Sequence, residues 1–248
     1  MKILVLYPHG LGDCILATPA LRERKIKTGD FIGIAIRERF RSSNFFFGCP
    51  WVDEVFYTKQ PWQDYPSYEI GCRDIIEKFK VIGKENGYDE VIFVDHSGHK
   101  ILSVAKTLEV DVFRNCHTEV YITEEQEEKA RFLIGSLKFG FVHTNTGVSA
   151  KDLPEEYGAK WIAKRLGIEH IVEVGKTFKY DEFDIGTQFA IMNLASGLCL
   201  PDSVFFHAAC ALDKKIDLSY FYKGSSVYDR VKPLHDSEHN LTYSLESV

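Results

Sequence analysis

Chemically active side chains gather in four short segments of the sequence, each directly after an apolar run. They are residues 8–13, 95–100, 143–151 and 200–212. Ligands of open parallel α/β sheets bind at the carboxyl ends of the strands, so segments in this position are the first places to search for a site.

The segment 8–13 reads Pro-His-Gly-Leu-Gly-Asp. Gly10 and Gly12 permit a tight turn and a close approach of the backbone to a ligand. Asp13 could act as a general base, or it could be a first-turn acid that stabilises the next helix, and its spacing alone favours the second role. The pattern G-x-G-x-x-G is incomplete, because Ile15 occupies the position of the last glycine.

The segment 143–151 combines hydroxyl groups, including that of Thr146, with a glycine and Lys151. Loop donors and one mobile cation suit a phosphate group, although a plain polar loop would have the same composition. It is not a P-loop, because G-x-x-x-x-G-K-[ST] is missing.

The segment 200–212 offers Asp202 or Ser203 as the cap of a helix, with His207 one turn further on. The N-terminus of such a helix could bind a pyrophosphate. A capped core helix with a buried histidine is the alternative. The segment 95–100 contains His96 and His99. A helix cap and a solvated loop are favoured there over a metal site, since neither histidine has a partner at metal-ligand spacing.

The elements that position these segments alternate along the chain. The predicted strands are 3–6, 31–36, 52–56, 91–94, 139–143, 170–174 and 215–218, and the predicted helices are 14–25, 70–86, 100–108, 124–137, 155–165, 188–195 and 203–212. Nearly unbroken Val- and Ile-rich strands between helices indicate an α/β protein with parallel sheets. Thr123 and Gln126 form a capping pattern for one helix. We expect two Rossmann-like halves, 1–137 and 138–248.

Composition narrows the function classes. The chain has 248 residues, 45% of them hydrophobic, with a net charge of −6, which is typical of a globular protein and argues against nucleic acid as a partner. No apolar run approaches the roughly 18 residues of a transmembrane segment. The apolar start is followed at once by a turn, and is interpreted as a buried strand and not as a signal peptide.

Six scattered cysteines form no C-x-x-C pair, so neither a zinc nor a redox motif is indicated. Free thiols without a signal sequence favour the cytoplasm, and peripheral placement at the inner face of the membrane stays open.

Five groups of segments follow one another along nearly the whole chain in a recognisable order. They are 2–5 with 10–22 (K-I-L-V, then G-L-G-D-C-I-L-A-T-P-A-L-R), 49–55 (C-P-W-V-D-E-V), 88–92 (Y-D-E-V-I), 151–156 (K-D-L-P-E-E) and 202–212 (D-S, then H-A-A-C-A-L). Together they resemble glycosyltransferase family 9, the ADP-heptose:lipopolysaccharide heptosyltransferase family.

The resemblance implies a GT-B fold, in which two Rossmann-like domains with parallel sheets face a cleft. It implies an inverting, metal-independent glycosyltransferase without a cofactor, which moves a sugar such as heptose. The C-terminal domain would bind a nucleotide-diphosphate sugar similar to ADP-heptose. The N-terminal domain would bind a saccharide or lipid-linked saccharide acceptor.

The same resemblance makes Asp13 the catalytic base, which takes a proton from the acceptor hydroxyl. The substrate-binding residues would be Gly10, Gly12, Thr146, Lys151, Asp202, Ser203 and His207. Glu173, Asp181 and Glu182 are candidates for the acidic residue that holds the donor's ribose.

Two other functions stay open. A non-catalytic descendant of the fold could bind a nucleotide or glycan, since Val204 stands where the family has glycine and Tyr7 where many members carry a basic residue. A sugar-nucleotide epimerase of similar fold would need an acid/base pair that the sequence does not identify.

Overall fold

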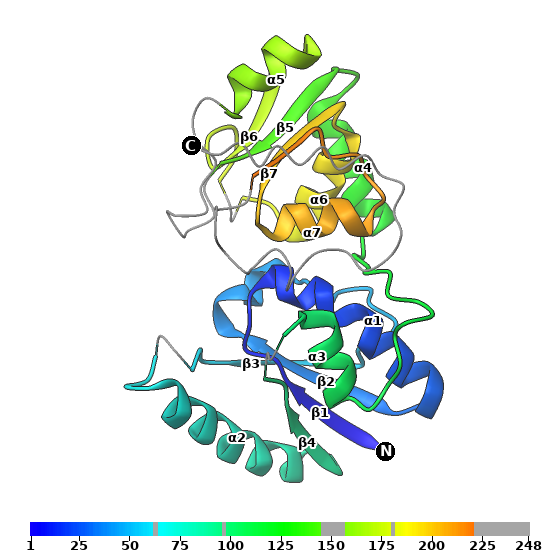
Figure 1. The fold of residues 1–248 in the computed structure, drawn as a ribbon, viewed down its shortest axis with the longest axis vertical. Coiled ribbons are helices and arrows are strands. Elements are labelled where there is room, and N and C mark those ends of the chain that lie inside the picture. The colour runs from blue at the N-terminus through cyan, green and yellow to red at the C-terminus, as the bar shows by residue number, and fades with distance from the viewer. Residues whose placement is uncertain (62–63, 96–97, 145–156, 180–181, 221–248) are drawn as a thin grey trace. The chain divides into compact units, whose positions relative to one another are not determined.

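The computed structural model describes residues 1–61, 64–95, 98–144, 157–179 and 182–220 (Figure 1). The chain divides into two compact units, Met1–Thr118 and Glu119–Val248. Each unit contains a four-stranded sheet in which every paired strand is parallel to its neighbour. The predicted α/β class with parallel sheets is therefore confirmed.

The first unit has the strand order β3-β2-β1-β4. Its strands are β1 (Lys2–Leu6), β2 (Phe31–Arg37), β3 (Glu54–Thr58) and β4 (Glu90–Phe93), and its helices are α1 (Leu11–Thr28), the 3₁₀ helix η1 (Glu38–Ser43), α2 (Tyr68–Glu85) and α3 (Lys100–Thr107). Helices α1 and α3 pack together on one face of the sheet, and α2 covers the other (Figure 1). Because both faces are covered, β1 and β2 are almost entirely buried, as their apolar runs predict.

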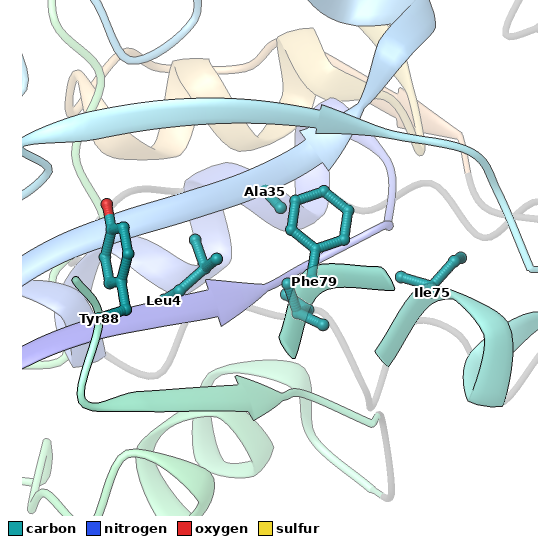
Figure 2. Close-up of a cluster of buried hydrophobic side chains, with 6 residues drawn as sticks. Leu4, Ala35, Ile75, Phe79 and Tyr88 are labelled. Atoms are coloured by element: carbon teal, nitrogen blue, oxygen red, sulfur yellow. The ribbon is translucent and has the colours of Figure 1, made fainter. Parts of the chain in front are cut away.

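A compact apolar cluster joins α2 to this sheet, as Figure 2 shows. Leu4 of β1 and Ala35 of β2 lie against Ile75 and Phe79 of α2, with Tyr88 alongside. Burial of such side chains is the main favourable contribution to folding. The cluster thereby fixes the sheet whose carboxyl edge holds the candidate site.

Helix α1 contains a proline in its interior, at position 19. Proline lacks the backbone N–H that would donate to the carbonyl oxygen four residues earlier, that of Ile15. The hydroxyl of Thr18 donates to this oxygen instead, at 2.7 Å. The Thr-Pro pair of the 10–22 motif is therefore compatible with an 18-residue helix.

The second unit has the strand order β6-β5-β7-β8. Its elements are α4 (Glu124–Ile134), β5 (Phe139–His143), α5 (Ala159–Leu166), β6 (His170–Val174), α6 (Ile185–Leu194), β7 (Gly197–Pro201), α7 (Val204–Ala211) and β8 (Leu218–Tyr220). Helix α5 lies on one face of the sheet and α6 and α7 on the other, with α4 packed against α6 (Figure 1). In the described parts of both units, no helix has the length and apolar character that a bilayer crossing requires.

The units divide earlier than the predicted boundary at residue 137, because α4 belongs to the second unit. The side-chain amide of Gln126 donates to the Asp184 carboxylate at 2.6 Å. Gly186 of α6 approaches so closely that an added Cβ would overlap the Gln126 side chain. The predicted capping pattern of Thr123 and Gln126 is confirmed. The pattern marks only where α4 begins, whereas the contacts with α6 place the helix in the second unit.

Phe79→Ala should lower the free energy of unfolding by about 3–5 kcal/mol, because it removes a fully buried ring and leaves a cavity in the cluster. Phe132→Ala is the matched control: the Phe132 side chain is 88% exposed, and its loss should change stability by less than about 0.5 kcal/mol. Urea unfolding followed by circular dichroism measures both. Equal effects of the two changes would contradict the packing of α2.

Candidate active site

The carboxyl ends of β1 and β4 lie side by side in the first unit. The two strands are parallel neighbours, with Leu6 paired to Phe93, although more than 80 residues separate them in the chain. Helix α1 follows β1, α3 follows β4, and both helices pack on the same face. The turn at residues 8–13 and the start of α3 are therefore brought together.

Asp13 lies in the first turn of α1, and both of its carboxylate oxygens are engaged. Oδ2 accepts a hydrogen bond from the backbone N–H of Gly10 at 2.9 Å, and Oδ1 forms an ion pair with the Lys100 ammonium group. The Asp13 side chain is 16% exposed. A first-turn acid also stabilises the partly positive N-terminus of a helix, so the alternative role predicted for this residue is fulfilled as well.

Gly10 is the N-cap of α1, and Gly12 lies in the first turn. The φ angle of Gly10 is −72°, which any residue can adopt, so backbone conformation does not require glycine here. A Cβ at Gly10 would lie 3.3 Å from Asp13 Oδ2. A side chain at this position would therefore crowd the carboxylate, and glycine avoids this close contact.

Two buried rings adjoin the carboxylate. The Nε2–H of His9 donates to the Val94 carbonyl oxygen at 3.1 Å, which links the exits of β1 and β4 a second time. Burial lowers the pKa of His9 below its ordinary 6.5, while the negative charge of Asp13 opposes this shift. The Tyr7 hydroxyl donates to the backbone oxygen of Asp13, and burial keeps the pKa of Tyr7 well above 10. Both rings are therefore neutral near pH 7.

Arg37 ends β2, the other neighbour of β1, and its side chain is buried. Burial first, and then the charge of Arg39, lower the pKa of Arg37 to about 10, whereas the Asp13 carboxylate raises it. Arg37 remains a cation at neutral pH. The Asp13 carboxylate therefore lies in the field of two cations, Lys100 in contact and Arg37 at longer range.

The second unit brings Asp202, Ser203 and His207 together beyond β7. Ser203 is the N-cap of α7, and His207 lies one turn inside that helix. His207 Nε2 is 3.7 Å from Asp202 Oδ1, and both side chains are more than nine-tenths buried. These three predicted residues thus form one group at the carboxyl end of a central strand.

The hydroxyl of Ser203 has an unusual environment for an N-cap. It makes no capping hydrogen bond to α7, and its Oγ is buried without a hydrogen-bond partner among the described residues. A buried hydroxyl without a partner is costly, and helix N-termini favour anions. Val204 follows as the first residue of α7, so the residue found in place of the family's glycine is accommodated as helix.

Glu173, a candidate ribose ligand, lies on β6 of the same sheet, with β5 between it and β7. Its carboxylate accepts from the Thr144 hydroxyl at 2.8 Å, at the carboxyl end of the adjacent β5, and pairs with Lys176 at 2.9 Å. Glu182 instead accepts from the backbone N–H of Lys179. Thr146, Lys151 and Asp181 lie outside the described residues.

Sequence reasoning missed three residues around Asp13, namely His9, Arg37 and Lys100. The segments that contain His9 and Lys100 were recognised as strand exits, but no local spacing relates Lys100 to Asp13. Only the pairing of β1 with β4 does so. Among the described residues, no three His, Cys, Asp or Glu side chains are grouped closely enough to hold a metal ion.

The buried His9 should titrate with a midpoint below 6.5, measured by NMR of its ring protons. Because the unfolded chain takes up this proton at the ordinary pKa, His9 reduces stability as the pH falls below about 6.5. Asp13→Asn should lower the midpoint further, since it removes the charge that opposes the shift. A midpoint at or above 6.5, or a rise in Asp13→Asn, would contradict this environment.

The sequence matches no protein-family model and no curated protein sequence. Solved structures do resemble the chain. A glycosyl transferase family 9 protein from Veillonella parvula DSM 2008 is 17% identical, with a TM-score of 0.61 over 88% of this chain and 79% of that one. The E. coli ADP-heptose lipopolysaccharide heptosyltransferase II is 15% identical, with a TM-score of 0.66 over 96% and 89%.

The E. coli heptosyltransferase WaaC, solved with ADP-2-deoxy-2-fluoro heptose, is 13% identical, with a TM-score of 0.51 and 88% of each chain covered. These likenesses span most of both chains. The chain therefore has the fold of the family 9 glycosyltransferases, and the resemblance that its motifs indicate is confirmed at the level of the fold.

Proposed function

We propose that the protein is an inverting glycosyltransferase of family 9, which moves a sugar from a nucleotide-diphosphate donor to a hydroxyl of a saccharide acceptor. The observation that carries this proposal is the Asp13 carboxylate. It is partly exposed at the carboxyl edge of the first sheet, and its orientation is fixed by the Gly10 N–H and Lys100. A carboxylate held in this way can accept the proton of an acceptor hydroxyl.

The reaction would proceed as one displacement. The acceptor oxygen attacks the anomeric carbon from the face opposite the nucleotide, and its proton passes to Asp13. The bond from that carbon to the diphosphate oxygen breaks, and both bonding electrons leave with the nucleoside diphosphate. Inversion follows from attack on the opposite face.

The second unit supplies groups suited to the diphosphate. This leaving group needs stabilisation of its charge more than it needs a proton. The buried Ser203 hydroxyl, without a partner among the described residues, and the N-terminus of α7 can donate hydrogen bonds to a phosphate. His207, in the first turns of the same helix, adds a further donor. Thr146 and Lys151 stay predictions for this role.

The donor is proposed to be an ADP-sugar such as ADP-heptose. Two structures of WaaC with this fold contain ADP or an ADP-heptose analogue, which supports a donor of this class. Glu173 would hold the ribose, because a carboxylate can accept from both hydroxyls of a vicinal diol. The ribose would then replace the Thr144 hydroxyl as its partner.

Asp13→Asn should lower kcat by at least ~10²-fold while the dissociation constant for ADP stays unchanged, because the amide cannot take up the proton. Asp111→Asn is the control, since Asp111 is an exposed carboxylate that accepts a local backbone hydrogen bond at 2.8 Å from Phe113. Release of ADP from ADP-heptose in the presence of candidate saccharide acceptors measures turnover, and calorimetry measures ADP binding.

Near wild-type turnover in Asp13→Asn would overturn the role of Asp13. ADP binding without turnover in the wild-type protein would instead favour the non-catalytic descendant. Formation of an epimer without transfer would favour the epimerase.

Ser203→Ala should weaken ADP binding about tenfold, the equivalent of one hydrogen bond of about 1.4 kcal/mol. Ser196→Ala is matched to it, because Ser196 is exposed at the amino end of the same strand, β7. Calorimetric titration with ADP compares the two variants. Equal affinities would remove Ser203 from the donor site.

A further inference from the structure

Helix α3 begins with a residue that its own stability disfavours. Lys100 is the first helical residue, and no acidic side chain lies in the first turn. The N-terminus of a helix carries a partial positive charge, so a cation there is unfavourable by a few tenths of a kcal/mol to about 1 kcal/mol. The reason for a lysine at this position must therefore lie outside the helix.

The partner of Lys100 lies in a distant part of the sequence. The Lys100 ammonium group is paired with Asp13 Oδ1, 87 residues away in the sequence. Only 19% of the lysine side chain and 16% of the aspartate side chain are exposed. Solvent therefore screens this ion pair less than it screens a surface pair. The lysine can then influence both the orientation and the charge of the Asp13 carboxylate.

Five other described groups act on Asp13 in different ways. His9 is neutral near pH 7, and burial raises the pKa values of Tyr7 and Cys14 well above their ordinary range, so these three carry no charge. Arg37 is a cation that influences Asp13 through space. The Gly10 N–H holds the other carboxylate oxygen.

We propose that Lys100 is the positioning residue of the base: it keeps the Asp13 carboxylate ionised and aimed for the acceptor hydroxyl. This inference rests on the proposed function, in which Asp13 takes the proton. Lys100 on one oxygen and Gly10 on the other hold the side chain in one orientation. An ionised carboxylate has about four acceptor positions in all, so two contacts of this kind do not exhaust its capacity to accept hydrogen bonds. An opposite charge in contact makes a carboxylate a weaker base, and in return the proposed base would be deprotonated and oriented before the acceptor binds.

Lys100→Met tests this role through the pH dependence of kcat/KM. An opposite charge in contact lowers a carboxyl pKa by roughly 1–3 units, so its removal should move the acidic limb upward by about one pH unit or more. Above the shifted limb, kcat should fall about tenfold through loss of orientation while the KM for the donor stays within about threefold. Lys100→Arg should leave the acidic limb close to its wild-type pH, because arginine retains the positive charge.

Lys106→Met is the control, because Lys106 lies on the same helix and is exposed. A normal circular dichroism spectrum of each variant shows that it is folded. An acidic limb that stays in place in Lys100→Met, or that moves equally in Lys106→Met, overturns the proposal.

A second readout does not depend on turnover. NMR of the labelled Asp13 carboxyl carbon should give a titration midpoint about one unit or more higher in Lys100→Met than in the wild type or Lys106→Met. An unchanged midpoint overturns the role of Lys100. Absence of transfer in the wild-type protein with every nucleotide sugar overturns only the proposed function, and the midpoint alone then decides whether Lys100 keeps Asp13 ionised.

Discussion

The parallel pairing of β1 with β4 is the constraint on which the candidate active site depends. The pairing aligns Leu6 with Phe93, so the turns after both strands leave the sheet at one edge. The ion pair of Asp13 with Lys100 and the hydrogen bond from His9 to Val94 then cross between them. Without this strand order, a carboxylate and its cation would be separated by 87 residues of chain with no reason to meet.

In the second unit, parallel pairing of strands again brings distant residues to one edge of the sheet. Its strands β5 and β7 are parallel neighbours, with Val142 paired to Cys199, so the residues after each strand share an edge. Thr144 and Asp202 occupy that edge with Glu173, which the adjacent β6 contributes. In each unit, strands distant in sequence converge to gather polar groups, as expected for ligand sites of parallel α/β sheets.

At Asp13, an observed structural role and the proposed chemical role depend on the same contact. Its carboxylate stabilises the start of α1 through the Gly10 N–H, and the same contact fixes the direction in which it points. A mostly buried charge requires such partners, because desolvation without them would favour the neutral acid. The first-turn role that spacing favours thus also orients the carboxylate for the base chemistry proposed for it.

The sequence by itself determined most of the elements and the strand exits that carry the candidate residues, although β7 (Gly197–Pro201) is not among the predicted strands. Strands β5 and β6 have the predicted bounds, the Thr123–Gln126 capping pattern marks the start of α4, and Asp13 and Ser203 lie at strand exits as expected. These features depend on the periodicity of apolar residues and on neighbours within a few positions, so the local sequence is sufficient to predict them. The tertiary structure alone decided that α4 belongs with α6, that Lys100 is the partner of Asp13, and that Ser203 makes no cap. Such outcomes depend on strand order and on packing between distant segments, and no local pattern encodes which distant segment will become the neighbour.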